Sequence, residues 1–317
     1  MTIALASAFH PRGEIPRLQK FLPQLRDAYT RICISVPPDT RADDVNALRD
    51  LNVAVVVTRD WSHGRHASLE LALTNRVLSG TERSGVESKD VSHIHYTDLD
   101  RLLRWIETRP DEWRAIVERA QTCACLIIGR TARAYATHPR ALVETEAISN
   151  LVGSYLLANC HCEEAIFADE AIPSQHSEPA VLGIASRKPL AMTLSARITV
   201  SPRPFDLSAG SKSFSCRAAE FLIAHSPPGR ALGMDAEWTL LLHRAGFAIE
   251  YVEVEGLDWE SADQFAENAA DADAQRRAAE QYDADPKHWA RRVAVALEIV
   301  ESGLSAMRRN LPGLENQ

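Results

Sequence analysis

The sequence predicts an α/β fold built on a mostly parallel sheet that is flanked by helices. Two observations carry this prediction. The N-terminal half alternates short apolar runs with longer segments whose apolar residues recur at helical spacing. The apolar runs are continuous, which is typical of strands covered by helices on both faces. Composition agrees, because 45% hydrophobic and 25% charged residues among 317 are ordinary values for a globular chain.

The expected elements follow one another in the order that such a sheet requires. Strands are expected at 2–9, 31–36, 53–58, 91–96, 123–129 and 247–254. Helices are expected at 15–29, 43–51, 66–78, 101–108, 111–121, 145–157 and 233–245, with Gly246 supplying the left-handed position after the last of them. Two segments are less regular, since 165–215 predicts short strands and loops and 214–224 fits either a strand or a helix. A helical tail follows, interrupted near Asp285 and Pro286.

Charge and cysteine content exclude several classes of protein. The 35 Lys and Arg against 43 Asp and Glu give a net charge of −8, which disfavours a nucleic-acid partner. No apolar run reaches the roughly 18 residues that a membrane span requires. Residues 1–10 lack the basic region of a signal peptide. Six cysteines without a secretion signal favour a reducing compartment, so we expect a cytoplasmic protein with free thiols.

The most informative segment is 93–101, in which Asp98 and Asp100 come at the end of an apolar strand. Ligands of parallel sheets bind outside the carboxyl ends of the strands. Residues two apart in an extended chain point to the same side, so the two carboxylates could share one Mg²⁺ or Mn²⁺ with a diphosphate. The alternative explanation is a turn and a helix N-cap, where Asp is common.

This arrangement resembles the GT-A class of nucleotide-sugar glycosyltransferases, and within it the family-2-like members. The resemblance covers roughly residues 1–255 and rests on the order of the segments. It implies a GT-A-like domain at 1–257, with a nucleotide-binding half at 1–130 and an acceptor half at 131–257, before a C-terminal helical extension at 258–317. It also implies a nucleoside-diphosphate-sugar donor, whose diphosphate is bridged by a divalent cation on Asp98 and Asp100.

Three residues are expected around the nucleotide. Phe9 follows the first strand and could pack on the base, and Asp39 follows the second strand and could accept from the base or ribose. Arg65 lies where a helix begins after the third strand, and a helix N-terminus with a guanidinium favours phosphate. The alternatives are turn and cap chemistry for Asp39 and a solvated surface position for Arg65.

The second half supplies the candidate catalytic acids. Asp235 and Glu237 open the helix at 233–245, where the resemblance implies a general base toward the acceptor hydroxyl. They lie about 200° apart around an ideal helix, so one of them at most should face the acceptor, and Asp235 is the first candidate. The alternative is capping and interaction with the helix dipole. His225 is the candidate for completing the metal shell, whereas His243 is expected to be solvated.

The function predicted from these features is a metal-dependent glycosyltransferase with an unidentified acceptor. One alternative is a nucleotidyltransferase, although residues 9–13 match its Gly-rich, Lys-containing loop poorly. The other is a non-catalytic binding or scaffold protein. The acidic residues at 253–260 are expected to lie on a strand edge and a solvated loop. An apolar stripe in the tail predicts packing on the chain's own domain, with a homodimer as the alternative; its members are Trp289, Val293, Ala296, Leu297 and Val300.

Overall fold

The computed structural model describes residues 2–60, 63–74, 91–159, 204–227, 232–264 and 266–311. The irregular segment expected at 165–215 lies mostly outside these residues.

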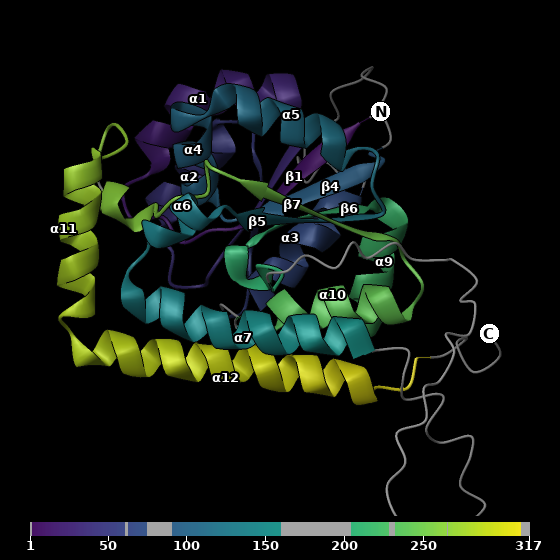
Figure 1. Ribbon diagram of the computed structural model, residues 1–317. Helices are drawn as coiled ribbons and strands as arrows, with labels where there is room; N and C mark the ends of the chain where they lie inside the picture. The colour runs from purple at the N-terminus through teal and green to yellow at the C-terminus, as the bar shows by residue number, and fades with distance from the viewer. Residues whose placement is uncertain are drawn as a thin grey trace, which may run out of the picture.

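A seven-stranded mixed sheet lies at the centre of the fold (Figure 1). The strand order is β3-β2-β1-β4-β6-β5-β7, and β6 alone runs antiparallel to its neighbours. The strands are β1 (Ile3–Ala8), β2 (Arg31–Val36), β3 (Ala54–Val57), β4 (His93–Thr97), β5 (Cys125–Arg130), β6 (Ser211–Ser215) and β7 (Ile249–Val254). The prediction of an α/β fold with a mostly parallel sheet is therefore confirmed.

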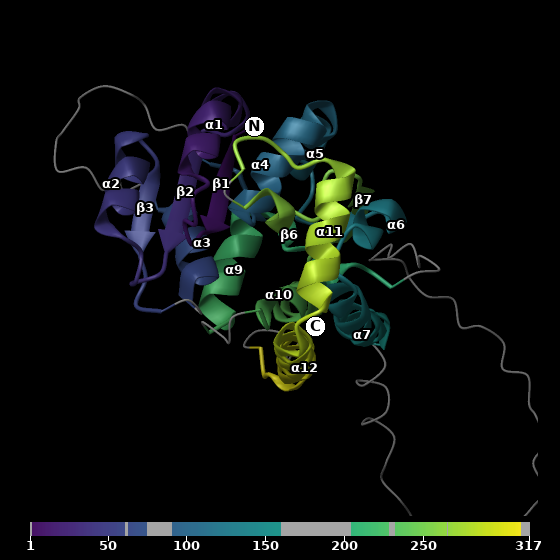
Figure 2. The same ribbon diagram turned by 90° about the vertical axis from the view of Figure 1, so that its left-hand side faces the viewer.

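Helices cover both faces of the sheet (Figures 1 and 2). One face carries α1 (Ile15–Ala28), α2 (Ala42–Asp50), α4 (Leu99–Thr108) and α5 (Pro110–Ala120). The other carries α3 (Gly64–Leu73), α9 (Cys216–His225) and α10 (Met234–Arg244). The other helices of the described residues are α6 (Ala132–Ala136), α7 (Arg140–Asn159), α11 (Ala272–Asp283), α12 (Pro286–Arg308) and the short 3₁₀ turns η2 (Leu207–Ala209) and η3 (Ser261–Asp263).

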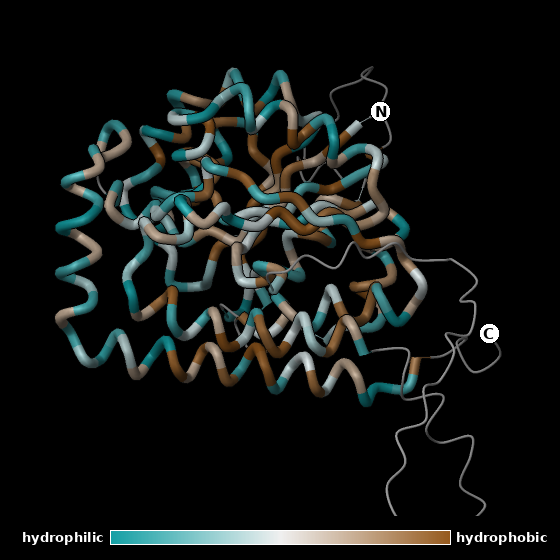
Figure 3. Tube along the Cα trace, viewed as in Figure 1, coloured by the Kyte–Doolittle hydropathy of each residue, from teal (hydrophilic) through white to brown (hydrophobic). Residues whose placement is uncertain are grey.

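The two faces bury separate apolar cores. Trp105 and Trp113 are fully buried on the side of α4 and α5. Trp238 packs edge-on against Tyr96 and Phe214 on the side of α10. Hydrophobic segments accordingly concentrate in the central strands (Figure 3). The continuous apolar runs predicted this arrangement, because each strand needs apolar side chains on both faces.

The C-terminal helix α12 packs on α7 and α10 of the same chain. The buried side of α12 contains Ala296, Ile299 and Gly303, whereas Val293 and Leu297 are 56% and 58% exposed. The expected intramolecular packing is confirmed, and Ala296 of the predicted stripe is buried, but Val293 and Leu297 of that stripe lie on the exposed side of the helix. Small residues let the helices approach closely, since a Cβ on Gly303 would lie 3.2 Å from a methyl of Leu240.

Three local predictions have clear outcomes. The segment 214–224 is a junction between β6 and α9, which explains why it fitted both a strand and a helix. Gly246 has φ +77°, as expected after α10. The prediction for His243 was wrong, because its side chain is only 3% exposed. All residues of α10 up to His243 are buried, since the sheet covers one side of this helix and α12 another.

Candidate functional site

Asp98 occupies the N-cap position of α4, directly after β4, but its side chain makes no capping hydrogen bond. Its carboxylate and that of Asp100 are each 26% exposed. The register of β4 with β1 and β6 puts this strand in the middle of the sheet. Helix capping therefore does not explain why an aspartate stands at position 98. Its carboxylate lies at the carboxyl end of a central strand.

Two guanidinium groups and a glycine turn surround Asp98. Arg65 Nη2 lies 3.9 Å from Oδ1, and Arg101 Nε lies 3.7 Å from Oδ2. Gly210, in the turn before β6, has φ +73°, and a Cβ there would lie 2.7 Å from Oδ2. Arg101 also donates to the carbonyl of Ala209 at 2.6 Å, which ties this turn to α4.

Asp100 lies among other carboxylates. Burial, followed by the charges of Glu260 and Asp98, raises the pKa of Asp100 to about 7. One carboxylate oxygen accepts from the backbone N–H of Arg101 at 2.9 Å, and Arg12 lies 3.8 Å away from the other. Carboxylates that raise one another's pKa favour a bound proton or cation, either of which reduces their repulsion. Carboxylate oxygens are also the ligands that Mg²⁺ and Mn²⁺ prefer, so Asp98 and Asp100 are the residues of this edge that could hold such an ion.

A buried ion cluster joins α3, β6 and α10 beside Asp98. Asp235 Oδ1 accepts from Arg65 Nη1 at 2.9 Å and from Lys212 Nζ at 3.1 Å. All three side chains are nine-tenths or more buried. Burial alone would raise the pKa of Asp235, but Arg65 and Lys212 lower it below its usual value. A carboxylate stabilised in this way is a weak proton acceptor, so the geometry favours Asp235 as the group that holds Arg65 in place.

Glu237 faces away from that cluster. Its carboxylate pairs with Arg309 at 2.7 Å and is 4% exposed overall. Asp235 and Glu237 thus meet different partners, as the helical spacing between them predicted. Neither carboxylate is free in this arrangement to meet an acceptor hydroxyl.

The other predicted site residues lie in three different surroundings. Phe9 is 4% exposed and belongs to the core beneath α1. Asp39 is exposed in the turn after β2. His225 ends α9, where its ring lies 4.3 Å from that of Phe221 and its carbonyl accepts from Arg309. The nucleotide contacts of Phe9 and Asp39 stay predictions, and for Phe9 they would require the side chain to leave the core.

Within the described part of the chain, no group of three or more His, Cys, Asp or Glu side chains is arranged to hold a metal ion. His225 is therefore not assembled with Asp98 and Asp100 in this arrangement. A cation at this edge would rest on the two aspartates alone among the predicted ligands.

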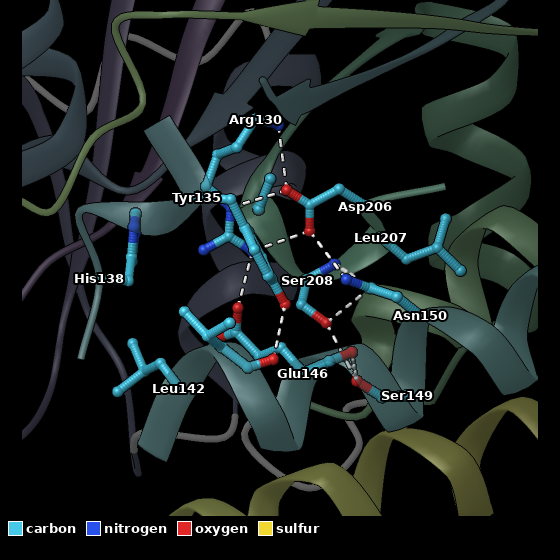
Figure 4. Close-up of polar contacts among 12 residues, drawn as sticks. Arg130, Tyr135, His138, Leu142, Glu146, Ser149, Asn150, Asp206, Leu207 and Ser208 are labelled. Atoms are coloured by element: carbon cyan, nitrogen blue, oxygen red, sulfur yellow. Dashed lines mark hydrogen bonds and ion pairs between the residues drawn. The ribbon is translucent and has the colours of Figure 1, made fainter. Parts of the chain in front are cut away.

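A second buried polar network holds the segment that precedes β6 (Figure 4). Arg130, the last residue of β5, donates to both carboxylate oxygens of Asp206 at 2.7 Å and to Glu146 at 2.7 Å. Asn150 of α7 donates to Asp206 at 3.0 Å and accepts from Ser208. Burial would raise the pKa of Asp206, but Arg130 lowers it. This network holds Asp206 and Ser208 in place, and the turn that they begin continues to Gly210, which lies against Asp98.

Several residues of this edge were not found from the sequence. Lys212 and Gly210 lie in 208–213, which lacks the glycine-lysine pattern of a phosphate loop, so no motif in the sequence points to them. The acidic segment after β7 was expected to be solvated, and this was wrong for Asp258 and Glu260, which are 9% and 8% exposed. Arg104 binds Asp258 at 2.7 Å, so buried arginines on α4 hold this segment down. An Asp-x-Asp-Arg sequence is the signal that could have drawn attention to α4.

In comparisons with known proteins, no family profile and no curated protein matches this sequence. Among the described residues, no helix combines the length and the apolar character that crossing a membrane requires.

Proposed function

We propose that this chain is a GT-A-like glycosyltransferase that transfers a sugar from a nucleoside-diphosphate-sugar to an acceptor hydroxyl. The observation that carries the proposal is the position of Asp98 and Asp100. Their carboxylates are partly exposed at the carboxyl end of a central strand, and Asp98 is free of the capping bond that would otherwise explain it. The order of parts also supports it, because a parallel β1–β4 half precedes the Asp-x-Asp and a mixed half follows.

The residues of this edge divide the work of such a transfer. Mn²⁺ or Mg²⁺ on Asp98 and Asp100 would neutralise the diphosphate leaving group. Arg65 adds a delocalised positive charge beside Asp98, where phosphate oxygens would lie, and Asp235 and Lys212 fix its orientation. Buried donors held rigidly in this way lose little freedom when a ligand binds.

The two alternatives are weaker on this geometry. A nucleotidyltransferase would need a basic loop after β1, and Arg12 there is 51% exposed and lies loosely beside Asp100. A scaffold would have no need for two partly exposed carboxylates at the carboxyl end of a central strand. Both alternatives nevertheless predict different ligands, so a binding screen separates them from a transferase.

The test is a thermal-shift screen of the full chain with UDP-, GDP-, CDP- and ADP-sugars, each with and without Mn²⁺. We expect at least one nucleotide-sugar to raise the melting temperature only when Mn²⁺ is present. A free nucleoside triphosphate that stabilises better than every nucleotide-sugar would favour the nucleotidyltransferase. No stabilisation by any nucleotide would favour the scaffold and contradict the proposal.

A further inference from the structure

Exposed apolar side chains gather on two neighbouring helices, α7 and α12. In the part of the chain that the structure describes, six large apolar side chains are exposed, and five of them belong to these two helices. They are Ile148, Leu151 and Tyr155 on α7 and Val293 and Leu297 on α12, and their exposed fractions range from 56% to 66%. A contiguous apolar patch on the surface of a protein usually marks a site of interaction.

The five residues belong to one surface, because α7 and α12 run side by side in the same direction (Figures 1 and 2). Arg292 of α12 bonds to Glu146 of α7, and a Cβ on Gly303 would lie 3.5 Å from a methyl of Leu156. Nearly the same separation in sequence joins both pairs, so the two exposed leucines lie level with one another. Both helices pack on α10 with their buried sides, so their exposed sides point away from it together.

The exposed side of α7 lacks the charges that a solvated helix face normally carries. From Ala147 to the end of the helix no residue is charged, and the exposed positions there are Ala147, Ile148, Leu151, Tyr155 and Ala158. The large members of this set recur every three or four residues, which is the spacing of a seam between packed helices. Small alanines flank them, so a second surface of the same kind could interlock with this one.

The charges on α12 fit a second copy of the chain in antiparallel orientation. Exposed Arg291 and Glu301 flank the apolar stretch 293–297, and Asp285 and Arg308 stand further out at the two ends of the helix. Both pairs are centred on that stretch. Two antiparallel α12 helices would therefore place Arg291 opposite Glu301 and Arg308 opposite Asp285, whereas a parallel pair in register would bring like charges together.

We propose that this surface, called here the outer face, binds the outer face of a second copy across a two-fold axis, with the two α12 helices antiparallel. The outer face consists of Ile148, Leu151, Tyr155, Val293 and Leu297. A two-fold axis brings the same patch of both copies together, so each apolar side chain meets another apolar surface. The inner side of α12 packs on its own chain and the outer side on the partner. This proposal does not rest on the proposed function, because it assigns no role to Asp98 or Asp100.

The test is analytical ultracentrifugation of the full chain over a series of concentrations. We expect the natural chain to reach twice its monomer mass of 35.1 kDa. Leu151→Glu and Leu297→Glu each put a charge into the centre of the interface, so each should weaken dimerisation about tenfold or more. Both positions are exposed in the single chain, so the variants should keep its fold, which circular dichroism checks.

Val57→Glu is the matched control, because Val57 of β3 is the sixth exposed large apolar residue and lies outside the outer face. It should dimerise as the natural chain does. A natural chain that stays at its monomer mass at every concentration would overturn the proposal and leave the outer face to a different protein. A dimer that survives unchanged in Leu151→Glu and Leu297→Glu would also overturn it, because its interface would then lie elsewhere.

Charge reversal tests the orientation of the two copies. Arg291→Glu and Glu301→Arg each place like charges opposite one another, so each should weaken dimerisation several-fold. The double variant restores opposite charges and should dimerise nearly as the natural chain does. A double variant that dimerises no better than either single variant would contradict the antiparallel arrangement.

Discussion

Gly210 determines how closely the turn before β6 approaches the carboxylate of Asp98. Its φ of +73° is one that side-chain-bearing residues adopt only at a cost, and a Cβ would lie 2.7 Å from Asp98 Oδ2. Gly246 has nearly the same backbone, with φ +77°, but a Cβ there would meet nothing within 4 Å. Comparing substitutions at the two glycines therefore separates the free-energy cost of the left-handed backbone from the cost of the contact with Asp98.

We expect Gly246→Ala to lower the free energy of unfolding by about 1–2 kcal/mol, which is the cost of the left-handed conformation. Gly210→Ala should lower it by more and should also reduce any Mn²⁺-dependent ligand binding, because Asp98 must move. Urea unfolding of both variants measures the difference. Equal losses in the two variants would show that Asp98 does not meet this turn.

Asp235 was expected from the sequence to be a base, and its surroundings indicate an ion-pair role. Asp235→Ala would leave Arg65 and Lys212 buried without their counter-charge, so the free energy of unfolding should fall by about 3–5 kcal/mol. Asp39→Ala, at an exposed turn, should change it by less than about 0.5 kcal/mol. If Asp235→Ala keeps full stability and loses only turnover, the original assignment as a base is right.

Four residues of this edge could be predicted from the sequence, and others could not, for a physical reason. Asp98, Asp100, Arg65 and Asp235 stand at the ends of apolar runs or the starts of helices, and such boundaries can be recognised locally. Lys212 is buried, and its partners depend on strand order, which no local pattern specifies. The charge state of Asp235 depends on the same long-range pairing.

At the scale of single elements, β4 carries a buried histidine that couples folding to pH. His95 is fully buried, and its ring nitrogens contact the hydroxyls of Tyr29 and Ser211 at 2.7 and 3.0 Å. Burial lowers the pKa of His95 to about 3. The unfolded chain binds a proton near pH 6.5 and the folded chain does not, so the contribution of His95 to stability is lost as pH falls below 6.5.

We therefore expect the stability difference between the natural chain and His95→Gln to shrink by about 1.4 kcal/mol between pH 7.5 and pH 5.5. Asp100, with its pKa raised to about 7, acts in the opposite direction, but it does so in both proteins and cancels in the difference. Urea unfolding at the two pH values measures the change. A difference that stays constant would mean that His95 titrates normally in the folded chain.

Helix α12 offers a matched pair of apolar residues on opposite sides. Ile299 is 1% exposed against α10 and α7, whereas Leu297 is 58% exposed. Ile299→Ala should cost about 2–5 kcal/mol of unfolding free energy, and Leu297→Ala should cost less than about 0.5 kcal/mol. Measured at a dilution that separates the two copies, comparable losses in the two variants would show that the outer side of α12 packs within its own chain.

At the scale of the whole molecule, the sequence predicted the fold class and most of the element boundaries. Continuous apolar runs and helical spacing are local signals, and they located β1 to β5, β7 and their helices. The bounds and direction of the antiparallel β6 were not predicted, because only five residues separate the turn at Gly210 from the start of α9. Its position between β4 and β5 depends on long-range pairing, and this pairing brings Gly210 to Asp98 and Lys212 to Asp235.

In the proposed function, Asp98 and Asp100 hold a divalent cation against a nucleotide-sugar diphosphate. Calorimetric titration of the best nucleotide-sugar, with and without Mn²⁺, compares the natural chain with the double variant Asp98→Asn, Asp100→Asn. We expect binding to the natural chain that requires Mn²⁺, and none to the double variant, whose folding is checked by its circular dichroism spectrum. Binding that survives unchanged in the double variant, or that is indifferent to Mn²⁺, would contradict it.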